Sequence, residues 1–167
     1  AKQSRQQKEH NYLKRFVKQM AEQRGFKVEL EVGTDAGGRI DVVLIRGPLK
    51  IACEISVTNT AEYEIQNLKK CIKAGYNEVV MLSQNTEHLR SIQEIAQKTL
   101  SKDHINQIKF LNTEQMISLL AIQEESLSQK ETRTRGYRVK TNYKSSGDKS
   151  VITDSIKGAI LKTKQKK

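Results

Sequence analysis

Hydrophobic residues in the first part of the chain recur with two different periods. Over residues 6–24 they recur every three or four positions with charged residues between them, which predicts an amphipathic helix closed by a glycine. Residues 27–32 instead alternate Lys or Glu with Val or Leu. We therefore expect a half-buried strand with Val28, Leu30 and Val32 on one face.

Two segments rich in β-branched residues follow a glycine-containing loop at residues 33–38. Residues 39–45 and 50–57 each predict a strand. The connection between them, Arg46-Gly47-Pro48-Leu49, is short and contains the only proline of the sequence. Such a connection joins antiparallel strands, so we predict a β-hairpin.

Helical and strand patterns alternate over the next part of the chain. Residues 61–74 predict a helix that ends at a glycine, 78–83 a covered strand, 86–102 a polar helix, 108–111 a strand and 113–124 a helix. The resulting order is α, β, β, β, α, β, α, β, α. A hairpin followed by helical crossovers implies an α/β (α+β) fold with a mixed sheet and helices on its faces.

Positive charge is concentrated in the last quarter of the chain. The net charge is +11, but residues 1–126 hold 18 Lys and Arg against 16 Asp and Glu, whereas residues 127–167 hold 12 against 3. We therefore expect a nearly neutral domain over 1–126 and a basic C-terminal extension over 127–167. The extension would attract nucleic acid, with Arg135, Arg138 and Lys140 as candidate contacts, or would serve as a solubilising tail.

The patterning of the extension also predicts secondary structure, namely one strand at about 137–143 and one helix at about 152–160. No apolar run reaches the roughly 20 residues that a membrane helix needs, so we expect no membrane contact. The two cysteines lie in apolar segments, which is typical of buried free thiols in a reducing compartment. We expect a cytoplasmic protein.

Two acidic residues interrupt the apolar pattern of the predicted hairpin. Asp41 lies near the start of its first strand, and Glu54 lies on its second strand with Ser56 on the same face. A carboxylate in so apolar a strand is unfavourable unless it binds a cation, is hydrogen-bonded or faces solvent. Two carboxylates at one end of adjacent strands can share a divalent cation, and oxygen ligands favour Mg²⁺ or Mn²⁺. The alternative is that both lie on a solvated face of the sheet.

Other catalytic motifs are absent from the sequence. Gly37-Gly38 precedes a predicted strand rather than a helix, so it is not a phosphate-binding glycine loop. Three histidines and two cysteines have no zinc-ligand spacing. These observations leave the two carboxylates as the leading candidate for chemistry.

The sequence Gly38-Arg39-Ile40-Asp41, followed after twelve residues by Glu54-Ile55-Ser56, resembles the motif of the PD-(D/E)XK nuclease superfamily. That superfamily includes restriction endonucleases, Holliday-junction resolvases and RecB-like nucleases, and the resemblance covers about residues 8–83. It implies a restriction-endonuclease-like αβββαβ core that cleaves DNA with bound Mg²⁺ or Mn²⁺. The runs EISVTNTAEYEIQNLKKCIKAGYNEVV and TRGYRVKTNYK are similar, more narrowly, to nuclease-like modules of conjugation-type ATPases of the HerA/FtsK kind. That similarity implies a larger ATPase or parent polypeptide as a partner.

One position departs from the superfamily pattern. Ser56 stands where most members have a lysine that contacts the attacking water and the phosphate, so Ser56 itself could offer only a hydrogen bond. Some members supply the lysine from the following helix, and Lys70 is our first candidate for that role, with Lys69 second. Lys73 lies on the same polar side of this helix, and Lys69 and Lys73 are candidate phosphate contacts. The alternative is a solvated basic face. Gln66 and Lys70 have the spacing of the Gln-x-x-x-Tyr motif of RecB-like members.

The resemblance assigns two further residues to the site. Glu9, on the first predicted helix, matches the place of an additional acidic residue that reaches the metal in many members. Arg39, next to Asp41, would contact the phosphate backbone of DNA. The alternative is that Glu9 is an ordinary residue of an exposed helix.

Our first functional hypothesis is a Mg²⁺-dependent DNA endonuclease domain in which Asp41 and Glu54 bind the metal and Lys70 assists catalysis. The second is a catalytically inactive nuclease-like module that binds DNA or docks onto a partner, which the missing lysine at position 56 favours. A third is an assembly domain that forms a homodimer by exchanging its basic extension.

Overall fold

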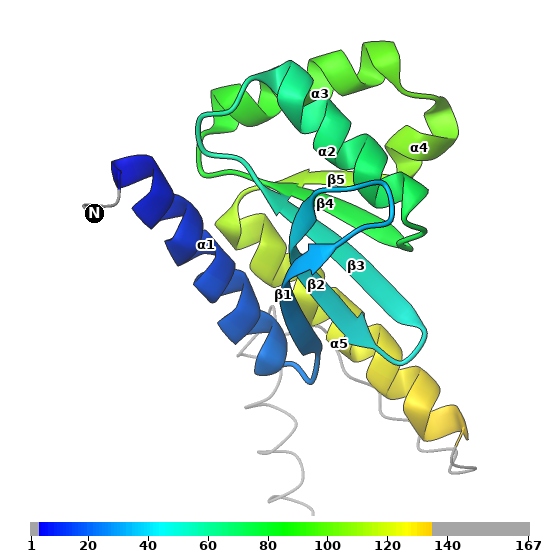
Figure 1. Ribbon diagram of the computed structural model, residues 1–167. Coiled ribbons are helices and arrows are strands. Elements are labelled where there is room, and N and C mark those ends of the chain that lie inside the picture. Colours follow the sequence, from blue (N-terminus) through cyan, green and yellow to red (C-terminus); the bar gives the residue numbers. More distant parts are fainter. Residues whose placement is uncertain (1–3, 135–167) are drawn as a thin grey trace, which may run out of the picture. The chain divides into compact units, whose positions relative to one another are not determined.

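The computed structural model describes residues 4–134 (Figure 1). Of the described residues, those up to Lys130 form one compact unit. The described part is an α/β protein with five helices and one mixed five-stranded sheet. Its elements are α1 (Arg5–Glu22), β1 (Lys27–Gly33), β2 (Arg39–Arg46), β3 (Leu49–Ile55), α2 (Ala61–Lys73), β4 (Glu78–Leu82), α3 (Thr86–Thr99), α4 (Lys102–Gln107), β5 (Ile108–Leu111) and α5 (Thr113–Thr134). No helix among the described residues has the length and apolar character needed to cross a membrane.

The five strands lie in the sheet in their chain order, β1-β2-β3-β4-β5. β1, β2 and β3 are antiparallel neighbours, whereas β3, β4 and β5 run parallel. The predicted hairpin is confirmed, with Gly47 and Pro48 between its paired strands. Gly47 has a φ of 56° and proline fixes a negative φ, so the two residues form the mirror-image turn that suits a two-residue hairpin.

Helices cover both faces of the sheet and create two hydrophobic clusters. On one face, α1 and α5 bury residues such as Leu13, Val17 and Leu120 against the sheet. On the other face, α2 and α3 contribute residues such as Leu68 and Ile92. Figure 1 shows α1 and α2 on opposite sides of the strands. The ends of β2 and β3 that are remote from the turn therefore lie between α1 and α2.

Two predicted helices differ from the structure. The helix predicted over 86–102 ends at Thr99, because the backbone of Leu100 is extended. The hydroxyl of Ser101 then accepts a hydrogen bond from the backbone N–H of His104 and begins the separate helix α4. The last predicted helix continues past residue 124 to Thr134, and the apolar side chain of Leu127 is buried in the cluster of α1 and α5.

The expectation that Val28, Leu30 and Val32 share one face is wrong. Val28 packs against the cluster under α1, Val32 packs against the cluster under α2, and Leu30 is exposed. Glu31, between them, has a φ of 53°, which breaks the alternation of side chains along an extended strand. The residue opposite this break, by the register of β1 and β2, is Asp41.

Several predictions fall on residues that the structure does not describe. These are the strand at 137–143, the helix at 152–160, and the candidate DNA contacts Arg135, Arg138 and Lys140. They lie outside the described range of 4–134.

Candidate active site

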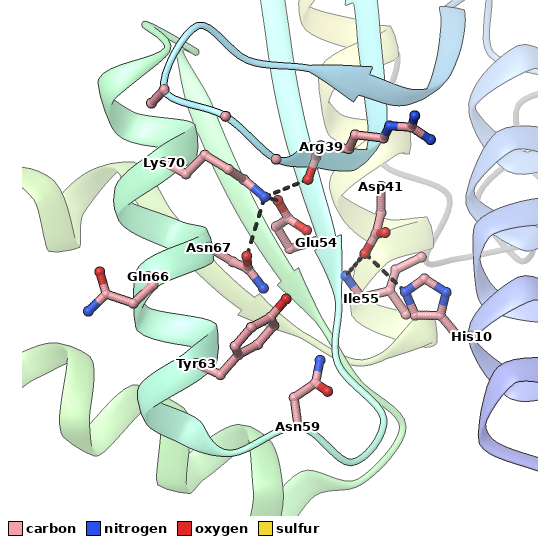
Figure 2. Close-up of a pocket in the computed structure, with 13 residues that line it drawn as sticks. His10, Arg39, Asp41, Glu54, Ile55, Asn59, Tyr63, Gln66, Asn67 and Lys70 are labelled. Atoms are coloured by element: carbon pink, nitrogen blue, oxygen red, sulfur yellow. Dashed lines mark hydrogen bonds and ion pairs between the residues drawn. The ribbon is translucent and has the colours of Figure 1, made fainter.

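The two carboxylates of the predicted hairpin line one cavity. Val42 and Cys53 are the last paired residues of β2 and β3, so Asp41 and Glu54 occupy the next position on each strand. Both side chains border a cavity of about 430 Å³, together with residues of α1, α2 and the loop before β2. Figure 2 shows the carboxylates side by side, Asp41 toward α1 and Glu54 toward α2. The antiparallel pairing therefore brings together two residues that are thirteen positions apart in the sequence.

The carboxylate of Asp41 is fixed by two hydrogen bonds to the same oxygen. The backbone N–H of Ile55 donates to Asp41 Oδ2 over 2.9 Å, and His10 Nε2 of α1 lies 3.1 Å from that atom. Burial by itself would raise the pKa of Asp41, but the hydrogen bond and charge of His10 and the N–H of Ile55 outweigh burial and lower it. Asp41 is thereby held as a carboxylate with one orientation.

His10 is changed by the same contact. The hydrogen bond with Asp41 raises the pKa of His10 above its ordinary value, and this effect exceeds the opposing effect of partial burial. The imidazolium form therefore persists toward neutral pH, and it links α1 to the sheet at the cavity.

Glu54 has a different environment, because its side chain is almost fully buried beneath α2. Its Oε1 lies 3.0 Å from Lys70 Nζ and accepts a hydrogen bond from the thiol of Cys71 over 3.3 Å. Burial and the neighbouring charge of Asp41 raise the pKa of Glu54 to about 7, although Lys70 opposes the shift. Glu54 therefore experiences the negative charge of Asp41, and a cation between the two carboxylates would reduce this repulsion.

The ammonium of Lys70 contacts three oxygen acceptors. Besides Glu54 Oε1, it donates to the backbone carbonyl of Arg39 and to Asn67 Oδ1 over 3.3 Å. These acceptors belong to β3, β2 and α2, and Figure 2 shows Nζ between them at the edge of the cavity. Of the three lysines predicted on α2, Lys70 is the one that lines the cavity formed by the described residues.

The other predicted residues of α2 and β3 lie elsewhere. Lys69 and Lys73 are exposed and are not part of the cavity wall. Ser56 is fully buried at the end of β3, where its hydroxyl lies 2.7 Å from His88 Nε2 of α3. Ser56 is not part of the cavity wall. Its hydroxyl is paired with His88 of α3, the helix that follows α2 and β4 in the chain.

Two predicted residues lie near the cavity without directing a charged group into it. Glu9 is half-buried on α1 and is not part of the wall, whereas its neighbour His10 is. Arg39 lines the cavity, but it contacts Lys70 through its carbonyl oxygen. Figure 2 shows its guanidinium turned away from Asp41 and Glu54.

The sequence did not single out the two polar residues of α2, Tyr63 and Asn67, that line the cavity. Asn59, Tyr63 and Asn67 line the cavity, and Asn59 and Asn67 both donate to the buried carboxylate of Glu64. The signal in the sequence was the spacing of Glu64, Asn67 and Lys70, since residues three apart on a helix are neighbours.

The donor set of the cavity suits a hard divalent cation. Asp41 Oδ1 and Glu54 Oε2 have no hydrogen-bond partner among the described residues, because the contacts of each side chain involve its other oxygen. Within residues 4–134, no group of three or more His, Cys, Asp and Glu side chains is arranged around a common metal position. A cation there would complete its shell with water or substrate oxygens, as Mg²⁺ commonly does.

Neither the protein-family models nor the curated protein sequences compared with the chain include a match.

Proposed function

We propose that the chain is a metal-dependent DNA endonuclease domain with a restriction-endonuclease-like core. One observation carries this proposal. Asp41 and Glu54 lie on adjoining strands and line one cavity, and Lys70 Nζ lies 3.0 Å from Glu54 Oε1. The order α1, β1, β2, β3, α2, β4 and the sequence Gly38-Arg39-Ile40-Asp41 support the PD-(D/E)XK assignment.

Asp41 and Glu54 would hold Mg²⁺ or Mn²⁺ through the oxygens that remain without hydrogen bonds. When bound, such an ion polarises the scissile phosphate and favours the hydroxide form of the attacking water. His10 and the N–H of Ile55 hold Asp41 in position, and they keep it deprotonated. Glu54, with its pKa of about 7, becomes a ligand by losing its proton.

Lys70 would supply the positive charge that most members of the superfamily take from the lysine at the place of Ser56. Its ammonium lies at the edge of the cavity next to a carboxylate, which suits contact with a phosphate oxygen or with the attacking water. The loop before β2 approaches Lys70 closely, since a Cβ at Gly38 would lie 3.5 Å from Lys70 Cδ. Gly38 has a φ of 80°, so a residue with a side chain there would strain the loop.

The main test is cleavage of supercoiled plasmid DNA with Mg²⁺, Mn²⁺ or EDTA. We expect nicking or linearisation that requires the metal and that falls at least about a hundredfold in Asp41→Ala and in Glu54→Ala, as for loss of a metal ligand. Asp35→Ala is the matched control. Asp35 is an exposed acidic residue in the loop before β2, and its side chain does not line the cavity. Equal cleavage by the parent and both site variants would refute the assignment.

A catalytically inactive module that binds DNA or docks onto a larger ATPase is the second candidate. It is favoured by the buried position of Ser56 and by the lack of a third acidic or histidine ligand within residues 4–134. Calorimetric titration with Mn²⁺ separates the two candidates, since an endonuclease must bind the ion and the inactive module need not. Retained DNA binding without Mn²⁺ binding would favour the module.

A further inference from the structure

A buried carboxylate on α2 lies just behind the cavity wall. Glu64 is 1% exposed and receives the side-chain amides of Asn59 and Asn67, each over 2.9 Å. None of the ion pairs found in the described part of the chain involves Glu64. A buried carboxylate is tolerated where hydrogen-bond donors replace water, and these two amides are the donors that the structure gives Glu64.

The hydrogen bonds of Glu64 determine how Asn67 is oriented. Because Asn67 donates its Nδ2 to Glu64 Oε2, its carbonyl oxygen must face the other way. That oxygen accepts the hydrogen bond from Lys70 Nζ over 3.3 Å. If the amide were reversed, an N–H group would face the ammonium and the contact would be lost.

These contacts form one continuous path along successive turns of α2. It runs from Glu64 through Asn67 to Lys70 and then across to Glu54 Oε1 at 3.0 Å. A lysine has four flexible side-chain bonds, so an ammonium that is not held would sample many positions. The path adds one oriented acceptor to the contacts that the ammonium makes with Glu54 Oε1 and with the backbone carbonyl of Arg39.

We propose that Glu64 is a positioning residue, which sets the ammonium of Lys70 beside Glu54 through the oriented amide of Asn67. The catalytic meaning of this arrangement rests on the proposed endonuclease function. The positioning itself is a property of the folded chain and can be measured without cleavage. Asn59 provides a built-in comparison, because it shares Glu64 but does not contact Lys70.

The test measures the reactivity of Lys70 toward a small amine-acylating reagent by peptide mass spectrometry. Lys69 and Lys73 are exposed on the same helix and serve as internal references, whereas the side chain of Lys70 is 13% exposed. We expect the ratio of Lys70 to Lys69 labelling to rise about threefold to tenfold in Asn67→Leu and in Glu64→Met, as for loss of one hydrogen bond. Asn59→Leu should leave the ratio within about twofold of the parent.

The outcomes distinguish positioning from a general structural role. An equal rise in Asn59→Leu and Asn67→Leu would overturn the proposal, because it would show loosening of α2 as a whole. An unchanged ratio in a folded Glu64→Met variant would also overturn it. If Glu64→Met does not fold, side-chain amide hydrogen exchange in the parent protein tests the same link. The amide protons of Asn67 should then exchange at least about tenfold more slowly than those of exposed Gln66, and equal rates would count against Glu64.

Cleavage assays extend the test if the parent protein is active. In a double-mutant cycle, Asn67→Leu should slow cleavage in the parent but add little to Lys70→Met, because both changes act through one ammonium. Gln123→Leu is the matched control, since it removes a side-chain hydrogen bond to Glu78 far from the cavity wall. Its effect should be the same with and without Lys70→Met. A parent protein that does not cleave DNA refutes the proposed function, while the labelling ratios still decide the positioning role.

Discussion

His10 Nε2 of α1 lies 3.1 Å from Asp41 Oδ2 of β2, and this contact joins a surface helix to the first carboxylate of the cavity. The two residues are 31 positions apart in the sequence. Their contact lowers the pKa of Asp41 and raises that of His10. The first helix therefore contributes to the electrostatics of the site, and it does so through His10 rather than through Glu9.

The titration of His10 provides a direct check of this pair. Because the hydrogen bond with Asp41 raises the pKa of His10, Asp41→Asn should move that pKa downward. Two-dimensional NMR of the imidazole carbon-bound protons between pH 5 and 9 measures the change.

The same pair makes a contribution to stability that depends on pH. A histidine with a raised pKa in the folded state stabilises the fold fully below its unfolded pKa of 6.5, and that contribution disappears as the pH rises through the folded value. His10→Gln should therefore be less stable than the parent at pH 5.5 and should approach it at pH 9. Urea unfolding at the two values measures this, and a difference that is larger at pH 9 would contradict the prediction.

Glu54 should also make stability fall with rising pH. Its pKa of about 7 in the folded state exceeds its ordinary value of 4.5, so the folded state holds a proton that the unfolded state has released between these values. Stability then decreases as the pH rises from about 4.5 to about 7 and is unaffected by this group above that range. Glu54→Gln removes the titration, so its free energy of unfolding relative to the parent should rise from pH 4.5 to pH 8 in metal-free buffer.

Divalent cations should offset the loss of stability that the ionisation of Glu54 causes. If Asp41 and Glu54 share Mn²⁺, the ion stabilises the folded chain according to its concentration relative to Kd, by about 2.7 kcal/mol at a hundredfold excess over Kd. Thermal unfolding with and without Mn²⁺ at pH 8 measures the increase in Tm. The increase should disappear in Asp41→Asn, and an equal increase in that variant would place the ion elsewhere.

Ser56 should contribute to stability through His88 rather than to the cavity. Ser56→Ala removes a buried hydrogen bond of 2.7 Å, which should lower the free energy of unfolding by roughly 1 kcal/mol. Denaturant unfolding measures the loss. Mn²⁺ affinity should be unaffected, because Ser56 does not line the cavity. A large loss of Mn²⁺ affinity would mean that Ser56 contributes to the metal site.

The sequence determined the element order because each helix and strand carries its own hydrophobic period. The hairpin of β2 and β3 was predictable from β-branched residues on either side of a Gly-Pro turn, and α2 was predictable from a stripe that contains Ile65 and Leu68. The break between α3 and α4 was not predicted, since Leu100 continues the helical pattern and only its extended backbone ends the helix. Periodicity does not encode such local backbone changes.

The residues of the candidate site were likewise predictable from the sequence only in part. Asp41 and Glu54 could be singled out because each interrupts an apolar strand, and hairpin pairing follows from the chain itself. Only the tertiary structure decided that Lys70, rather than Lys69 or Lys73, lies beside Glu54, because helix rotation against the sheet is set by packing of its buried stripe. The contacts of His10 with Asp41 and of Glu64 with Asn59 and Asn67 were likewise beyond the sequence. They depend on side-chain directions, and those are fixed only when helices and sheet exclude water between them.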